Sequence, residues 1–135
     1  MRTPAELTDL FRSQGMKVTP QREAVFRALM DNDLHPTAEA VHAAVTAEMP
    51  NVSLRTVYQV LNDLAAMGEI QALDLGTGAA RFDPNVDAHH HLVCSVCGNV
   101  RDVYVDPVAI PAAAPGFTVE SAEVVYRGRC DMCAS

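Results

Sequence analysis

The sequence predicts an α+β protein, in which a helical N-terminal half precedes a smaller half built mainly from strands. Three observations predict it. Helix-start residues repeatedly precede apolar residues at helical spacing before residue 68. A hairpin pattern then covers residues 70–83, and strand-forming stretches interrupted by prolines cover the rest. A chain of 135 residues is long enough for two small domains.

The first two expected helices begin at Thr-Pro pairs. Thr3 is the predicted N-cap of the first helix, Pro4 its first helical residue, and Glu6 completes a capping box. Gly15 is the expected stop, and Thr19-Pro20 starts the second helix. The apolar faces of the two helices are Leu7, Leu10 and Phe11, and Val25, Phe26, Leu29 and Met30.

The third and fourth expected helices follow His35-Pro36-Thr37 and Ser53. The fourth carries an apolar stripe, and Gly68 ends it; the stripe is Val57, Val60, Leu61 and Leu64. Its opposite face presents side chains that reach base edges and phosphates in a major groove, namely Arg55, Tyr58, Gln59 and Asn62. Any amphipathic helix has a polar face, so this feature alone does not establish DNA binding.

A hairpin pattern after these helices strengthens the DNA-binding interpretation. Residues 70–75 and 79–83 are strand-like, and Gly76-Thr77-Gly78 lies between them. Helices followed by such a wing form a winged helix-turn-helix, whose fourth helix here would read DNA. We therefore predict a winged-helix DNA-binding domain over residues 1–83. Lys17, Arg22 and Arg55 provide local positive charge at two helix starts.

The overall charge of −7 is unfavourable for binding nucleic acid, so any DNA surface has to be local. Residues 1–83 hold seven basic and eleven acidic side chains, and residues 84–135 hold three and six. No apolar run approaches the roughly 18 residues that span a membrane. The N-terminal residues lack the apolar core of a signal peptide, so we expect a cytoplasmic protein.

The second half begins after a turn-rich hinge at residues 84–88. Residues 100–105 and 117–126 read as strands, and Pro107, Pro111 and Pro115 leave room only for a short helix between them. A sheet this small, with apolar faces, is expected to bury one face in a twofold dimer. We therefore predict a small α/β dimerisation and metal-binding domain over residues 89–135.

Two Cys-x-x-Cys pairs predict a closed metal site in this second domain. Cys94 and Cys97 form one pair, and Cys130 and Cys133 the other. Two such turns complete a tetrahedral sulfur shell with no position left for water, which is typical of structural zinc. A redox switch built from the same thiols is the alternative.

A histidine cluster predicts a second, different metal site. His89 and His91 alternate along an extended segment and project to one side, whereas His90 points away. Asp83 and Asp102 lie near them in sequence, and His35 is a more distant candidate. Nitrogen and oxygen donors suit other ions than sulfur does.

These pieces together resemble the ferric uptake regulator family. The resemblance rests on Val18-Thr19-Pro20-Gln21-Arg22, His35-Pro36-Thr37-Ala38, Ser53-Leu54-Arg55-Thr56-Val57-Tyr58 and the core His89 to Gly98. It covers nearly the whole chain and implies a dimeric, metal-dependent repressor with a winged helix domain and a C-terminal dimerisation domain. It also implies that Lys17, Arg22, Arg55 and Tyr58 lie at or near DNA.

Within this family the sequence is most similar to the peroxide-sensing branch, because aspartates stand at positions 83 and 102. The resemblance implies a regulatory iron(II) or manganese(II) site with five ligands, and zinc on the four cysteines. The five ligands are His35, Asp83, His89, His91 and Asp102. It further implies that peroxide oxidises a ligand histidine, His35 or His89, so that the metal and then the operator are released.

Three other functions use the same residues. An iron-responsive repressor would use the regulatory ligands reversibly. A zinc-responsive repressor fits less well, because the regulatory ligands include no cysteine. A small metalloenzyme, such as a hydrolase or dismutase, would also use histidines and aspartate. The sequence contains no HExxH or other recognised catalytic motif, and the winged helix would be unexplained, so we do not expect an enzyme.

Overall fold

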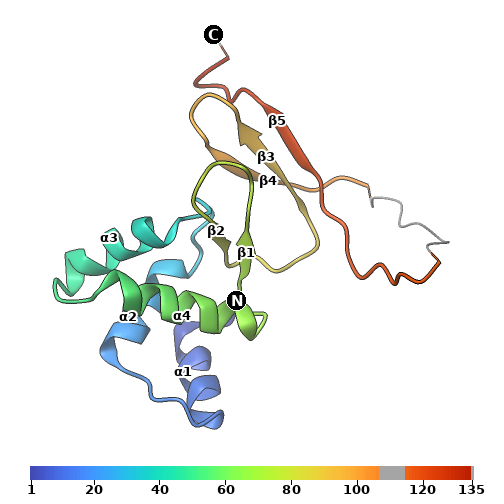
Figure 1. Ribbon diagram of the computed structural model, residues 1–135. Coiled ribbons are helices and arrows are strands. Elements are labelled where there is room, and N and C mark those ends of the chain that lie inside the picture. Colours follow the sequence, from blue (N-terminus) through green and yellow to red (C-terminus); the bar gives the residue numbers. More distant parts are fainter. Residues whose placement is uncertain (107–114, 135) are drawn as a thin grey trace. The chain divides into compact units, whose positions relative to one another are not determined.

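The computed structural model describes residues 1–106 and 115–134, and it divides into two compact units (Figure 1). Unit 1 is Met1–Val86 and unit 2 is Asp87–Ser135. The predicted α+β class is confirmed, since helices dominate unit 1 and strands dominate the described part of unit 2. The short helix expected at residues 107–115 falls outside the described residues, apart from a turn at Pro115.

Unit 1 contains four helices, and each begins at the helix-start segment that the sequence predicted. The helices are α1 (Pro4–Ser13), α2 (Pro20–Leu29), α3 (Ala38–Glu48) and α4 (Leu54–Ala66). The side chains of Thr3, Thr19, Thr37 and Ser53 each accept a hydrogen bond from the backbone N–H three residues later. Gly15 follows α1 at φ +73°, a left-handed conformation that glycine adopts without strain.

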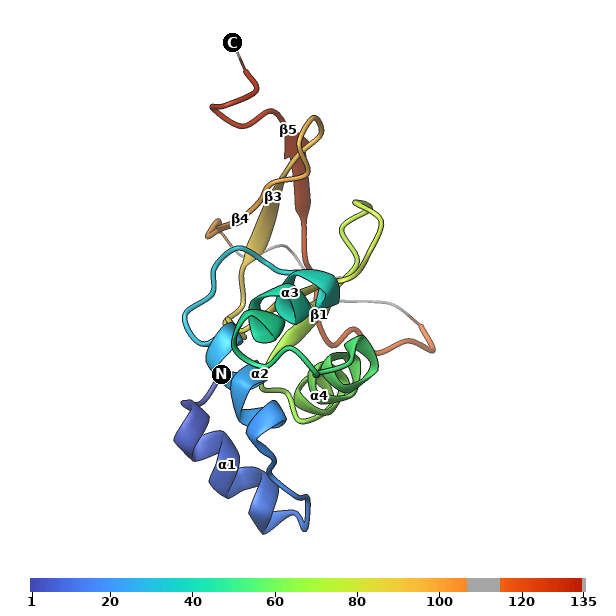
Figure 2. The ribbon, with the colours of Figure 1, turned by 90° about the vertical axis from the view of Figure 1, so that its left-hand side faces the viewer.

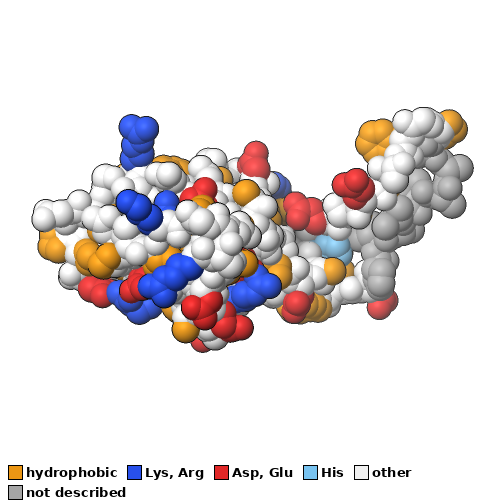
Figure 3. Space-filling view, turned by 90° about the horizontal axis from the view of Figure 1, so that it is seen from below, with side chains coloured by type: hydrophobic (Ala, Val, Ile, Leu, Met, Phe, Trp, Pro, Cys, Tyr) orange, Lys and Arg blue, Asp and Glu red, His pale blue; other side chains and the backbone are white. Residues whose placement is uncertain are grey.

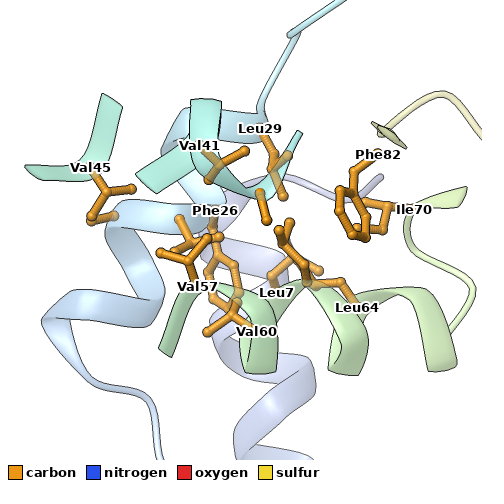
Figure 4. Close-up of a cluster of buried hydrophobic side chains, with 14 of the residues drawn as sticks. Leu7, Phe26, Leu29, Val41, Val45, Val57, Val60, Leu64, Ile70 and Phe82 are labelled. Atoms are coloured by element: carbon orange, nitrogen blue, oxygen red, sulfur yellow. The ribbon is translucent and has the colours of Figure 1, made fainter. Parts of the chain in front are cut away.

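The core of unit 1 forms where α2 contacts the other three helices (Figure 4). Phe26 of α2 and Phe11 of α1 pack edge to face, with ring centroids 5.1 Å apart. Val57, Val60 and Leu64 turn the apolar stripe of α4 into this core, as Figure 4 shows. The opposite face of α4 is therefore fixed at the surface.

The wing of unit 1 is a short antiparallel hairpin of β1 (Gln71–Leu73) and β2 (Arg81–Asp83). Both strands are shorter than the sequence predicted, but the hairpin itself is confirmed. Phe82 points into the helical core, so its neighbours Arg81 and Asp83 project to the other side of β2. That alternation places Asp83 beside the turn that precedes α3, where the bridge between Thr37 and Arg81 joins the turn to the wing.

The described residues of unit 2 form a three-stranded sheet with the order β4-β3-β5, visible in Figures 1 and 2. Its strands are β3 (His90–Cys94), β4 (Val100–Val103) and β5 (Val125–Gly128). The central strand β3 pairs antiparallel with β4 and parallel with β5. Because His91 lies opposite Asp102 in this register, both project from the same side of the sheet.

The prediction of a strand over residues 117–126 is wrong for most of its length, because β5 begins only at Val125. The register explains why. Val125 pairs with His91, and β3 begins only one residue earlier, so the residues before Val124 have no part of β3 to pair with. The β-branched composition alone could not reveal where the partner strand ends.

Across the described ranges, no helix has the length and apolar character needed to cross a lipid bilayer.

Candidate metal centres

The four cysteines converge at one end of the unit 2 sheet. Cys94 ends β3, Cys97 lies in the turn that follows it, and the other two, Cys130 and Cys133, come just after β5. Their sulfur atoms all lie within 4.8 Å of one another, and those of Cys97 and Cys130 are 3.7 Å apart. A tetrahedral zinc with bonds of about 2.3 Å separates its sulfurs by roughly 3.8 Å. The thiols are free, and their spacing fits zinc.

Local hydrogen bonds give two of these thiols very different pKa values. Backbone N–H groups of Cys97, Cys130 and Val96 lower the pKa of the Cys94 thiol to about 6. Hydrogen bonding to the Cys130 side chain raises the pKa of Cys133 to about 12. The four sulfurs therefore cannot all become thiolates unless a cation balances their charge.

An ion pair that the sequence analysis missed joins the second cysteine pair to the sheet. Arg101 of β4 donates to Asp131, between Cys130 and Cys133, at 2.6 Å. This bond holds the pKa of Asp131 below its usual range and raises that of Arg101. The pairing crosses 30 positions of sequence, so no local pattern could have identified it.

Three predicted ligands meet at the opposite end of the same sheet, where β3 begins. The Nε2 atoms of His89 and His91 lie 3.0 and 3.6 Å from Oδ1 of Asp102. The two imidazole rings are 4.7 Å apart, centroid to centroid. Two imidazoles that face one carboxylate oxygen make a nitrogen/oxygen donor set suited to iron, manganese or zinc.

The backbone orients the His89 ring for binding. Its Nδ1 is 2.6 Å from the carbonyl oxygen of Asp87, which can only accept a hydrogen bond. Nδ1 is therefore the donor in this contact, which leaves Nε2, the atom that lies beside Asp102, as the one available to bind an ion. Tyr104 lies beside the same ring, with centroids 5.6 Å apart. These contacts fix the donor atom before any ion binds.

Unit 1 supplies the remaining two predicted ligands as a pair. Nε2 of His35, in the turn before α3, lies 3.2 Å from Oδ2 of Asp83 at the end of β2. Both side chains are buried. A hydrogen bond orients the carboxylate, because its other oxygen, Oδ1, accepts the backbone N–H of Asn85 at 2.9 Å. The pair is a second nitrogen/oxygen donor set, formed within unit 1 alone.

The other two histidines have structural partners. His90 points away from the ligand side, as predicted, and its Nδ1 accepts the backbone N–H of Val124 at 2.9 Å. His42 of α3 places its Nε2 2.8 Å from the carbonyl oxygen of Val52. It joins α3 to the loop before α4.

The predicted DNA-contacting residues lie at the surface of unit 1. Arg55 and Tyr58 are exposed on α4, and the Tyr58 hydroxyl donates to Glu39 of α3 at 3.2 Å, which raises the pKa of the phenol. Lys17 is exposed before α2. Basic and acidic side chains alternate on the face shown in Figure 3, so no broad basic surface is present there.

Arg22 has contacts that the sequence did not indicate. Its guanidinium lies 5.8 Å from the centroid of the Phe11 ring and donates to the backbone carbonyl of Lys17. The side chain therefore organises the turn that presents Lys17, in addition to any contact it makes itself.

Comparisons with known proteins agree on the family of this chain. A model of the ferric uptake regulator family matches residues 13–126. The peroxide-responsive repressor PerR of Staphylococcus aureus (strain USA300) is 36% identical over 91 residues, which are 67% of this chain and 62% of that protein. The chain thus matches less than two thirds of the length of that relative.

Solved structures agree on the fold. The ferric uptake regulator Fur of Helicobacter pylori, described with three functional metal binding sites, superposes with a TM-score of 0.77 at 21% identity, covering 97% of this chain and 91% of that one. The ferric uptake regulator of Pseudomonas aeruginosa with manganese gives 0.67 at 27% identity, with coverages of 97% and 99%.

Proposed function

This chain belongs to the ferric uptake regulator family, and from that premise we propose that it is a metal-dependent DNA-binding repressor that senses peroxide. Members of the family are transcriptional regulators and not enzymes, which confirms the expectation that this chain is not one. The observation that carries the proposal is the pre-oriented, cysteine-free donor set of His89, His91 and Asp102.

The regulatory ion is proposed to have five ligands from this chain. Unit 2 contributes the donor set just described, and unit 1 contributes His35 and Asp83. Support comes from the donor chemistry of each group and from the family resemblance. Five ligands would leave an octahedral ion one position for peroxide. We propose iron(II) or manganese(II) for this site and a structural zinc for the four cysteines.

Metal control of DNA binding follows from where the ligands belong in the chain. An ion held by ligands from both units restrains the angle between them. In a twofold homodimer that angle sets the separation of the two α4 helices, which have to enter major grooves about 34 Å apart. The ion acts as an effector only to the extent that it binds the DNA-competent arrangement more tightly. Such a protein would work on DNA in the cytoplasm.

Peroxide sensing is proposed to consume a ligand. Iron(II) held by these ligands would relay electrons from an imidazole to peroxide, a redox role that manganese(II) does not readily take. In the net reaction one peroxide oxygen is added to a ring carbon of His35 or His89, and the other leaves as water. The altered ring is a poorer donor, so the ligand set loses affinity for its ion and the restraint on the two units is lost.

The proposed peroxide response can be tested on DNA fragments that are first selected for binding to the manganese-loaded protein. Fluorescence anisotropy would follow binding by the iron-loaded and manganese-loaded forms, with and without dilute peroxide, and mass spectrometry would examine the histidine peptides. We expect only the iron-loaded form to release DNA and to gain one oxygen atom on the His35 or His89 peptide.

The same experiment separates the alternatives. An iron-responsive repressor, favoured by the likeness to ferric uptake regulators, would regain full DNA binding when iron is resupplied and would carry no added oxygen. An iron-loaded form that keeps both its DNA and its unmodified histidines under peroxide rules out peroxide sensing.

A further inference from the structure

The turn that carries His35 has a backbone conformation that its own sequence disfavours. His35 has φ +51°, in the left-handed region that residues other than glycine rarely adopt. It also precedes Pro36, and proline steers the residue before it toward extended conformations. Local preference therefore does not produce this turn. Such a conformation persists only where the surrounding structure holds it.

Strand β2 provides the holding contacts, all within unit 1. Nη1 of Arg81 donates to the carbonyl oxygen of His35 at 3.3 Å. The next residue, Phe82, donates its backbone N–H to the carbonyl oxygen of Pro36 at 2.9 Å. Arg81 and Asp83 project from the same side of β2, so one meets the backbone of His35 while the other faces its ring.

We propose that Arg81 is a positioning residue for the regulatory metal, because it holds His35 in the conformation that presents Nε2 beside Asp83. The inference rests on the proposed function only in naming the ion. Arg81 is not itself a ligand, since its guanidinium stays protonated and offers only donors. A charged donor is well suited to this task, because its hydrogen bond to a carbonyl is stronger than one from a neutral group.

A purely structural role for Arg81 in the wing is the competing explanation. The wing is already held by backbone pairing of Leu73 with Arg81 and of Gln71 with Asp83. Those bonds involve no arginine side chain. The guanidinium contact to His35 therefore points to the ligand turn rather than to the hairpin.

The experiment uses the zinc-loaded full chain and four variants. Arg81→Met removes the donor at similar length, Arg81→Lys keeps a charged donor, and Arg12→Met is the matched control on the exposed end of α1. The fourth variant adds Pro36→Ala to Arg81→Met, which relaxes the restriction on His35. Amide hydrogen exchange at Phe82, whose N–H donates to the turn at Pro36, is measured without regulatory metal, and manganese(II) affinity is measured by electron paramagnetic resonance.

We expect Arg81→Met to speed exchange of the Phe82 amide and to weaken manganese binding about tenfold, as the loss of a charge-assisted hydrogen bond would. Arg81→Lys should lose less, Arg12→Met nothing, and the added Pro36→Ala should recover part of the affinity. The proposal is overturned if Arg81→Met leaves both measurements unchanged, or if Pro36→Ala recovers nothing while the Gln71 and Leu73 amides of β1, which report on the hairpin, also exchange faster. If the parent chain binds no manganese, the proposed function fails, and the metal-free exchange rates still decide the role of Arg81.

Discussion

At the scale of single residues, strand alternation in β3 gives neighbouring histidines different tasks. His91 shares a side of the sheet with Asp102, whereas His90 faces the other side and bonds the backbone of Val124. The period of two predicted this division from sequence. It could not predict the bond between His89 and the carbonyl of Asp87, because that bond depends on the turn before the strand.

Asp102→Asn is expected to weaken binding of manganese(II) or iron(II) at least about tenfold, because an amide oxygen replaces a charged donor between two imidazoles. Zinc content should stay unchanged. Asp106→Asn, four residues further along the same segment and exposed, is the control. Titration with each metal, followed by calorimetry, measures the effect. Equal affinities for the Asp102 and Asp106 variants would remove Asp102 from the ligand set.

Cys97→Ser is expected to lower zinc content well below one ion per chain and to reduce the thermal stability of unit 2. Three sulfurs cannot close the tetrahedral shell, and binding energy at a structural zinc site is also folding energy. Zinc analysis and circular dichroism measure the two effects. Ser95→Ala, in the same turn with an exposed side chain, is the control. A Cys97→Ser protein that retains full zinc would remove Cys97 from the zinc site, whereas a parent protein without zinc would favour the redox alternative.

At the scale of elements, the sequence predicted where the helices begin but not where strand β5 begins. Thr3, Thr19, Thr37 and Ser53 cap helices through contacts three residues away, so each signal lies within its own segment. The start of β5 depends on where β3 begins, more than 30 residues earlier in the chain. Long-range pairing of this kind leaves no mark on local composition.

Helix α4 has an apolar stripe in the core and a polar face at the surface, and the charge of that face should govern DNA affinity. Arg55→Ala is expected to weaken binding to every DNA sequence by a similar factor and to reduce the slope of log affinity against log salt by about 1, as the loss of one phosphate contact does. Anisotropy at several salt concentrations measures the slope. Arg27→Ala on α2, whose side chain pairs with Glu48, is the control. An unchanged slope for Arg55→Ala would exclude a phosphate contact.

At the scale of the whole molecule, the two ligand groups belong to different compact units of the chain. His35 and Asp83 are brought together by the wing of unit 1, and His89, His91 and Asp102 by the sheet of unit 2. The chain has a net charge of −7, which on its own disfavours binding to DNA. A cation bound between such groups would both reduce that charge and restrain the units, so metal and DNA binding should be coupled.

That coupling has to be reciprocal. If manganese(II) raises the affinity of the dimer for its DNA by some factor, bound DNA raises manganese affinity by the same factor, because both follow from one thermodynamic cycle. We expect a factor of roughly 5–150, the range of ordinary coupling free energies. Manganese affinity measured by electron paramagnetic resonance, with and without saturating DNA, gives one side of the cycle, and anisotropy with and without manganese gives the other. In the Asp102→Asn variant both factors should fall together toward one. A metal that raises DNA affinity while DNA leaves metal affinity unchanged would mean that the ion acts through aggregation or through the DNA, and not through a restraint on the two units.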